Sequence, residues 1–138
     1  MRIRAWWKIL AVALSCLTQP AWAEDKDPLE AALEACLGTN QGMTTAGMVE
    51  CTGTAIAAWD QRLNEVYRNA IRTLDPKSRD LLRTSQRQWL AFREAEHALQ
   101  RGPWGGSRGS LGRVEIMAAD LSAIKERVSE LTIYAPGN

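Results

Sequence analysis

The residues that could do chemistry are few, and the first of them form a pair on two consecutive helical segments. Asp60 and Arg93 lie about 15 and 17 residues from a corner at Asp75–Pro76, so they stand at similar distances along antiparallel neighbours. We expect an ion pair between them, with Asn64 supplying hydrogen bonds. Acid–base catalysis would need a second titratable partner in a cleft, and the sequence shows none. We interpret the three residues as a structural polar group and predict no enzyme activity and no cofactor.

His97 is the only histidine of the chain. No other residue stands near it at the spacing of metal ligands, and structural zinc sites use four ligands. We therefore predict a surface or packing role for His97 and no metal site.

A glycine-rich segment at 102–110 is the second candidate for function. It contains tryptophan and arginine, the residue types enriched in binding hot spots, among glycines that let the backbone approach a partner closely. The candidate binding loop consists of Trp104, Gly105, Gly106, Ser107 and Arg108. The alternative is a flexible crossover between helices. Nucleotide binding is disfavoured because no strand precedes this segment and no lysine follows at the P-loop spacing.

The elements that must position these residues are all helical. Apolar residues recur at three- and four-residue spacing over 28–37, 45–74, 76–101 and from about Ser110 to Leu131. Asp27–Pro28 and Asp75–Pro76 are typical of helix starts, and no stretch alternates with period two. The predicted fold class is all-α, a compact bundle of about four helices.

The segment 85–97 organises this bundle in our prediction. Leu82, Trp89, Phe92 and Leu99 recur on one face, which we expect to pack against partner helices. The heads of polar residues beside this row, among them Arg93, are expected to reach a neighbouring helix.

The start of the chain has the pattern of a secretory signal peptide. Basic residues precede a short apolar run at 9–17, and Ala21–Trp22–Ala23 is an A-x-A cleavage site. We expect cleavage after Ala23, a periplasmic or secreted domain at 24–138, and membrane contact only through the signal peptide. A lipid anchor at Cys16 is the disfavoured alternative.

Removal of this segment takes three basic residues away and leaves 14 basic and 16 acidic ones, a net charge of −2. No basic surface for nucleic acid is implied. Cys36 and Cys51 remain, and an even pair in an exported domain predicts a disulfide, with two free thiols as the alternative. Closing this loop would stabilise the fold by about 3 kcal/mol in the chain-entropy model.

Several motifs together resemble the lysozyme inhibitor LprI-like N-terminal domain family, over nearly the whole mature chain. They comprise Cys36 and Cys51, Asp60-x-x-Leu63-Asn64-x-x-Tyr67, Gln86-Arg87-x-Trp89-Leu90-x-Phe92-Arg93 and Gly105-Gly106-Ser107. The resemblance implies an exported, mostly helical protein and, from the member that names the family, lysozyme inhibition. Family members often carry a further cysteine pair, where this chain has His97 and a residue near Met117. The resemblance therefore implies that the glycine-rich segment lacks a covalent clamp here.

Two functions from different classes follow as hypotheses. The first is a protein that binds and inhibits a peptidoglycan-cleaving lysozyme, with Arg108 meeting the two catalytic carboxylates of that enzyme. The acidic N-terminal helix, with Asp27, Glu30 and Glu34, could meet a basic enzyme surface or simply be solvated. The alternative is a general envelope interaction module with another partner.

Overall fold

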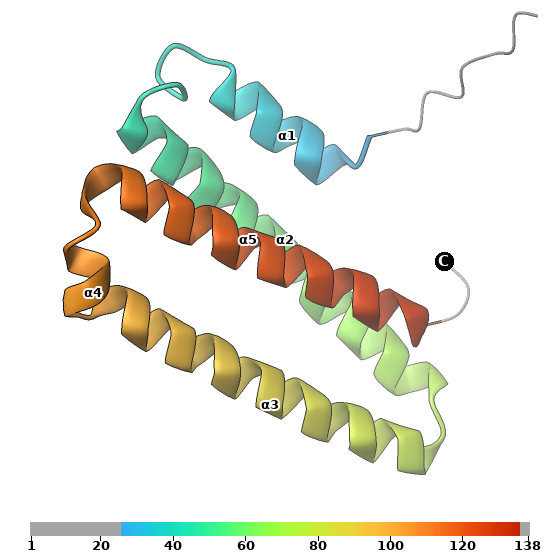
Figure 1. The fold of residues 1–138 in the computed structure, drawn as a ribbon. Coiled ribbons are helices and arrows are strands. Elements are labelled where there is room, and N and C mark those ends of the chain that lie inside the picture. Colours follow the sequence, from blue (N-terminus) through green and yellow to red (C-terminus); the bar gives the residue numbers. More distant parts are fainter. Residues whose placement is uncertain (1–25, 136–138) are drawn as a thin grey trace, which may run out of the picture.

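Five helices make up the computed structural model, which describes residues 26–135 (Figure 1). They are α1 (Pro28–Leu37), α2 (Thr45–Thr73), α3 (Pro76–Arg101), α4 (Pro103–Gly106) and α5 (Gly109–Ile133). The described residues contain no strand. The all-α prediction is therefore confirmed, with one single-turn helix, α4, in the segment that was expected to be a glycine-rich loop.

Local signals start the helices where the sequence predicts. The Asp27 carboxylate accepts a hydrogen bond from the Leu29 backbone N–H at 2.9 Å. The Asp75 carboxylate accepts bonds from the backbone N–H groups of Lys77 and Ser78 at 3.0 and 3.1 Å, and Pro76 follows it. Side-chain acceptors satisfy N–H groups that a helix start leaves without partners, and they stabilise each start in this way. The two-residue corner at Leu74 and Asp75 makes α2 and α3 antiparallel (Figure 1).

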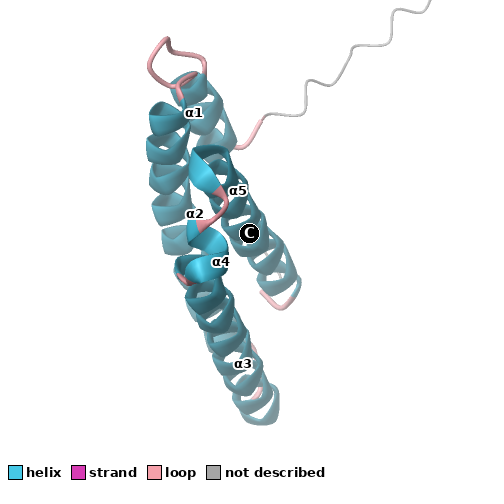
Figure 2. Ribbon diagram, turned by 60° about the vertical axis from the view of Figure 1, so that its left-hand side comes forward, coloured by secondary structure: helices cyan, strands magenta, loops and turns pink. Residues whose placement is uncertain are grey.

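The core lies between α2 and α5, which run side by side in the same direction (Figures 1 and 2). Both helices turn their predicted apolar rows toward each other. The buried apolar residues of this pair are Cys51, Ala55, Trp59, Leu63, Ala70, Leu121, Ile124, Val128 and Leu131. Burial of these side chains is the main apolar contribution to folding.

Helix α1 covers the α2–α5 pair and is joined to it covalently. The predicted disulfide between Cys36 and Cys51 is confirmed, with 5.8 Å between the two Cα atoms. The acidic side chains of α1 have partners inside the fold. Asp27 pairs with Arg62 of α2, and Glu30 lies 2.7 Å from Lys125 Nζ of α5. These contacts favour a structural role for the acidic residues over docking to a basic partner.

Helix α3 departs from the prediction, because its apolar row divides into two. Leu82 is buried and Trp89 is half-buried, but Phe92 is 61% exposed and Leu99 53% exposed. The side of α3 that faces α2 and α5 carries long polar side chains, Gln86 and Arg93 among them. Such side chains bridge to the neighbouring helices and keep the backbones apart, so the apolar residues farther round α3 stay in water. The expectation that Phe92 and Leu99 belong to the core is wrong.

The predicted signal peptide, its cleavage site and Cys16 lie outside the described residues. Within residues 26–135 no helix is both long enough and apolar enough to span a membrane.

Candidate functional site

Arg93 connects three helices through its guanidinium group. Its Nη1 lies 2.9 Å from Asp60 Oδ1 on α2, so the structure brings the predicted pair together. On the other side, Nε and Nη2 donate to the two oxygens of Asp120 on α5 at 2.9 and 3.2 Å. The Arg93 and Asp120 side chains are 17% and 12% exposed, whereas that of Asp60 is 43% exposed. The bidentate bond to Asp120 is therefore the stronger half of this bridge.

Asp120 remains ionised because two donors hold its carboxylate. Burial opposes ionisation of Asp120, but the hydrogen bonds from Arg93 and His97 outweigh it and lower the pKa of this carboxyl. The bond to Asp120 in turn raises the pKa of Arg93. Both groups are thus charged at neutral pH, as a buried ion pair requires.

The sequence prediction missed Asp120. It follows Met117 by three residues on α5, in the run Met117–Ala118–Ala119–Asp120–Leu121. A single carboxylate among small and apolar residues of a helix is rarely buried without a cationic partner. That pattern is the signal that could have indicated a bridge from α5 to Arg93.

His97 and Asp120 form a hydrogen bond between α3 and α5. His97 Nε2 lies 2.9 Å from Asp120 Oδ1, and the His97 side chain is half-buried. His97 and Asp120 thus lie close enough to form the pair of titratable groups that acid–base catalysis would need, which the sequence did not predict. Among residues 26–135, however, no hydroxyl or thiol forms a hydrogen bond with His97, so this pair has no nucleophile arranged beside it. Residues 26–135 also contain no cluster of three side chains suited to a metal ion.

Asn64 does not take part in this network. Its Nδ2 donates to the backbone carbonyl of Asp60, one turn earlier on α2, at 2.8 Å. The side chain is exposed and satisfies a local acceptor. The prediction that Asn64 supports the ion pair is wrong.

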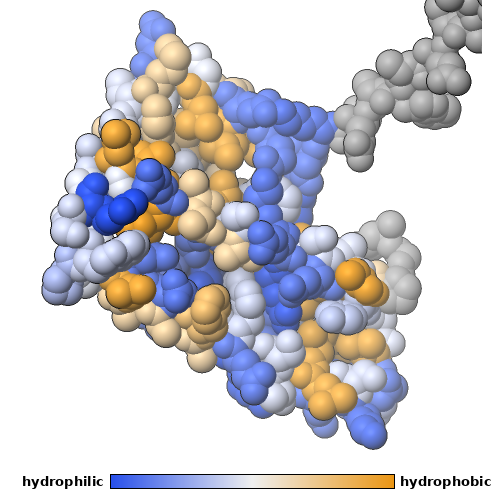
Figure 3. Space-filling model, in the orientation of Figure 1, coloured by the Kyte–Doolittle hydropathy of each residue, from blue (hydrophilic) through white to orange (hydrophobic). Residues whose placement is uncertain are grey.

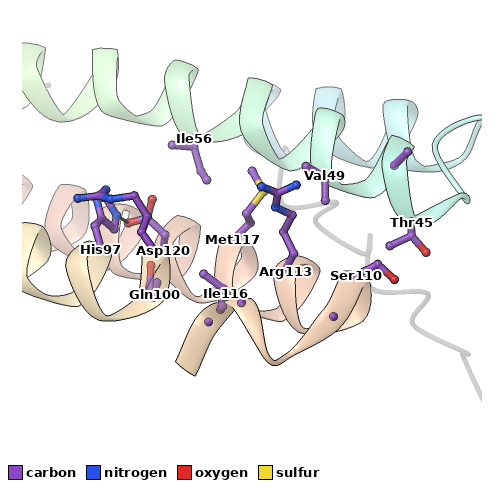
Figure 4. A pocket seen from close by; sticks show the side chains of 15 residues that line it. Thr45, Val49, Ile56, His97, Gln100, Ser110, Arg113, Ile116, Met117 and Asp120 are labelled. Carbon is purple, nitrogen blue, oxygen red and sulfur yellow. Dashed lines mark hydrogen bonds and ion pairs between the residues drawn. The ribbon is translucent and has the colours of Figure 1, made fainter. Parts of the chain in front are cut away.

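An open pocket of about 990 Å³ lies where the starts of α2 and α5 meet the end of α3 and α4 (Figure 4). His97 and Asp120 line one end of it, and Thr45 and Ser110 line the other. Arg113 of α5 points into the space between, beside Met117. Basic side chains outnumber the acidic ones in this lining, and the one carboxylate, Asp120, is already paired.

This pocket also contains both positions at which the family resemblance implies a missing cysteine pair. His97 and Met117 line it from α3 and α5. The hydrogen bond between His97 and Asp120 joins the same two helices there without a covalent link. The middle of α5 is thus tied to α3 by a noncovalent contact.

Gly105 and Gly106 line this pocket, and the segment Trp104–Arg108 that contains them is held by internal contacts, unlike a flexible crossover. Gly105 packs against the end of α3, where a Cβ atom would lie 1.6 Å from the Gln100 carbonyl oxygen. The Ser107 hydroxyl donates to the Trp104 carbonyl at 2.7 Å. Glycine is therefore required at position 105 by the chain's own packing. By contrast, Gly106 has open space around it.

Trp104 and Arg108 stack on each other at the surface of this segment. The Arg108 Cζ atom lies 5.5 Å from the Trp104 ring centroid, and its Nη2 lies 2.7 Å from Glu115 Oε2. Both side chains are about half exposed. The cation–π contact and the ion pair hold the guanidinium in one orientation.

Seven of the family motif residues meet in a smaller groove of about 290 Å³ between α2 and α3. The motif residues that line it are Asp60, Leu63, Asn64, Tyr67, Gln86, Arg87 and Leu90. Leu63 belongs to the core, Tyr67 is half-buried, and Arg87 is exposed and donates to the Thr84 hydroxyl at 2.9 Å. The groove therefore contains both packing and surface residues of the motifs.

A second polar bridge, which the sequence prediction also missed, starts from Arg127 of α5. Its Nε donates to Gln86 Oε1 at 2.9 Å and its Nη2 to the Ser85 hydroxyl at 3.1 Å. The guanidinium lies 6.0 Å from the Trp89 ring centroid and pairs with Glu130 at 2.7 Å. The buried Gln86 and the half-buried Trp89 thus position α3 against α5.

Comparison with known proteins agrees with this fold. A crystal structure of an uncharacterized protein from Burkholderia thailandensis matches with a TM-score of 0.73 and 28% sequence identity, over 79% of this chain and 53% of that one. The chain thus spans about half the length of that protein. No curated protein matches it. The family model described as "Lysozyme inhibitor LprI" matches residues 36–131, and the chain therefore belongs to the LprI lysozyme inhibitor family.

Proposed function

We propose that this chain is an exported binding protein that inhibits a peptidoglycan-cleaving lysozyme by direct contact. The observation that carries this proposal, beside family membership, is the exposed Trp104–Arg108 stack at the end of the molecule where α4 joins α3 to α5. Tryptophan and arginine dominate the energetics of protein interfaces. A stack that is already ordered in the free protein loses little conformational entropy on binding.

The chemistry of the target fits the charge of this end of the molecule. Lysozyme-type hydrolysis uses two carboxyl groups in a cleft. Arg108 could exchange its exposed pair with Glu115 for a carboxylate of the enzyme, because surface pairs are weak and guanidinium–carboxylate bonds strengthen when water is excluded. Arg101 and Arg113 line the adjoining pocket and add positive charge around the contact.

Export is part of the same proposal. We infer that residues 1–23 are a signal peptide and that 24–138 form the mature domain in the periplasm or outside the cell, without a cofactor or metal. The disulfide between Cys36 and Cys51 supports an oxidising compartment.

The test is protection of a peptidoglycan suspension against a chicken-type lysozyme, with the purified, oxidised mature chain titrated in. We expect dose-dependent protection that saturates at a fixed stoichiometry. Arg108→Ala and Trp104→Ala should each raise the half-protective concentration about tenfold or more, which corresponds to about 1.4 kcal/mol. Arg72→Ala, an exposed arginine near the far end of α2, is the matched control and should protect like the parent protein.

Two outcomes would count against this assignment. Unchanged potency of Arg108→Ala and Trp104→Ala would exclude the α4 segment as the inhibitory contact. No protection by folded, oxidised protein would exclude inhibition of this lysozyme class and favour the general envelope interaction module.

A further inference from the structure

Helix α3 has an outer face that no part of the described chain covers. Leu81, Phe92 and Leu99 are 64%, 61% and 53% exposed. Their separations of three and two helical turns place them on one side of α3. This side is about 110° around the helix from the face that carries Gln86 and Arg93, at about 100° per residue. Apolar patches are visible along the edge of the molecule that α3 and α4 form (Figure 3).

Between these three residues the outer face contains small or uncharged side chains only. They are Thr84, Gln88, Ala91, Ala95 and Ala98, all exposed. From Leu81 to Leu99 this face extends about 27 Å, at 1.5 Å per residue. A helix face that remains in water usually carries charges, whereas an apolar or uncharged row at alternating three- and four-residue spacing is typical of helix–helix contact. We call this side of α3 the outer row. It consists of Leu81, Phe92 and Leu99 together with the uncharged residues that lie between them.

Charged residues border the outer row in a regular order. Asp80, Arg87, Glu94 and Arg101 follow one another at seven-residue intervals, with alternating sign, along one side of the row. If a second α3 lies antiparallel across the outer row, Asp80 meets Arg101 of the other copy and Arg87 meets Glu94 of the other copy. In a parallel arrangement, the four charged residues of one copy would instead lie opposite the other border of the row in the second copy. That border carries Phe92 and Leu99 and offers no opposite charge.

Side-chain sizes along the outer row agree with the antiparallel arrangement. The pairing that matches these charges places Leu81 opposite Ala98, Thr84 opposite Ala95 and Gln88 opposite Ala91. Each larger side chain then meets an alanine, which lets two helices approach closely. The present partners of the border charges are exposed and weak, since Asp80 pairs with Arg83 at 2.9 Å and Glu94 with Arg101 at 2.7 Å within one helix.

We propose that the outer row of α3 is a self-association surface, through which two copies of this chain pair antiparallel about a two-fold axis near residues 90 and 91. The surface contains no residue of the Trp104–Arg108 stack and shares only Arg101 with the surroundings of the proposed lysozyme contact, and different variants test the two proposals. Contact along one helix pair belongs to the small interfaces. We therefore expect a dissociation constant of about 1 to 100 µM.

Sedimentation equilibrium of the mature chain from about 1 µM to about 300 µM tests this proposal. The parent protein should pass from monomer to dimer over this range. Phe92→Glu and Ala95→Glu should each remain monomeric, because each places a carboxylate in the outer row. Ile133→Glu is the control, since Ile133 is 76% exposed on α5, and it should dimerise like the parent protein. Far-UV circular dichroism identifies any variant that does not fold. If one of the two outer-row variants does not fold, the other one provides the test.

Charge reversal tests the orientation. Arg87→Glu and Glu94→Arg should each weaken the dimer at least tenfold, and the double variant should restore it, because the reversed charges again face each other across the two-fold axis. A parent protein that stays monomeric at about 300 µM would overturn the proposal. Equal dimerisation of Phe92→Glu, Ala95→Glu and the control would also overturn it, and lack of rescue in the double variant would overturn the antiparallel arrangement.

Discussion

Helices α3 and α5 have nearly the same length, 26 and 25 residues, but different forces hold them in the fold. On α5, Leu121, Ile124, Val128 and Leu131 are buried against α2. On α3, only Leu82 and Gln86 are buried. Helix α5 is therefore held mainly by apolar burial, and α3 mainly by polar side chains that bridge to it.

Two arginine bridges join α3 to α2 and α5. Arg93 reaches from α3 to Asp60 and Asp120, and Arg127 reaches from α5 to Gln86 and Ser85. Hydrogen bonds to charged groups contribute about 1.5 to 3 kcal/mol each, and their loss leaves a buried charge without a partner. A helix with few buried apolar contacts unfolds locally at a lower free energy. We thus expect α3 to open before the α2–α5 pair.

The largest effect should come from a truncation on α5. Ile124 is fully buried, so Ile124→Ala should lower the free energy of unfolding by about 3 to 4 kcal/mol. Phe92→Ala removes a larger side chain from α3 but should cost less than about 1 kcal/mol. Urea denaturation below about 1 µM protein, where self-association does not contribute, measures both. Similar losses for the two variants would contradict the difference between the helices.

An intermediate effect should come from Arg93→Gln. This change removes the charge that holds Asp60 and Asp120, and should lower the free energy of unfolding by about 2 to 3 kcal/mol. Arg87→Gln is the matched control on the exposed side of α3, with an expected loss below about 0.5 kcal/mol. Hydrogen exchange should show the loss first in α3 amides. Uniform acceleration across α2, α3 and α5 would mean that the bridge does not act on α3 alone.

The smallest effect should appear as a pH dependence. Because the folded pKa of Asp120 lies below its ordinary value of 3.8, its contribution to stability is complete above that value and is lost as pH falls through the folded pKa. The gap in unfolding free energy between the parent protein and Asp120→Asn should therefore be narrower at about pH 3 than at about pH 6. Hydrogen bonds with Ser78 also lower the pKa of Asp75, but both proteins contain Asp75, so its contribution cancels in the difference between their unfolding free energies. A gap that does not change with pH would show that Asp120 does not act through its charge.

The candidate site was only partly predictable. The ion pair of Asp60 and Arg93 followed from similar distances to one corner, since antiparallel helices of known rise place such residues opposite each other. Asp120 lies on α5, which follows α3 and α4 in the chain and packs beside the Asp60–Arg93 pair only in the tertiary structure. No local rule relates its position to Arg93, and the contact of His97 with Asp120 was missed for the same reason.

The sequence by itself determined the helix starts at Asp27 and Asp75, the apolar rows of α2 and α5, and the pairing of Cys36 with Cys51. Local hydrogen bonds, continuous periodicity and the presence of two cysteines in the predicted mature domain are enough to indicate these features. Only the tertiary structure decided which side of α3 faces the fold. Each residue turns a helix by about 100°, so neighbours such as Phe92 and Arg93 compete for the inner side, and the carboxylates of α2 and α5 select Arg93.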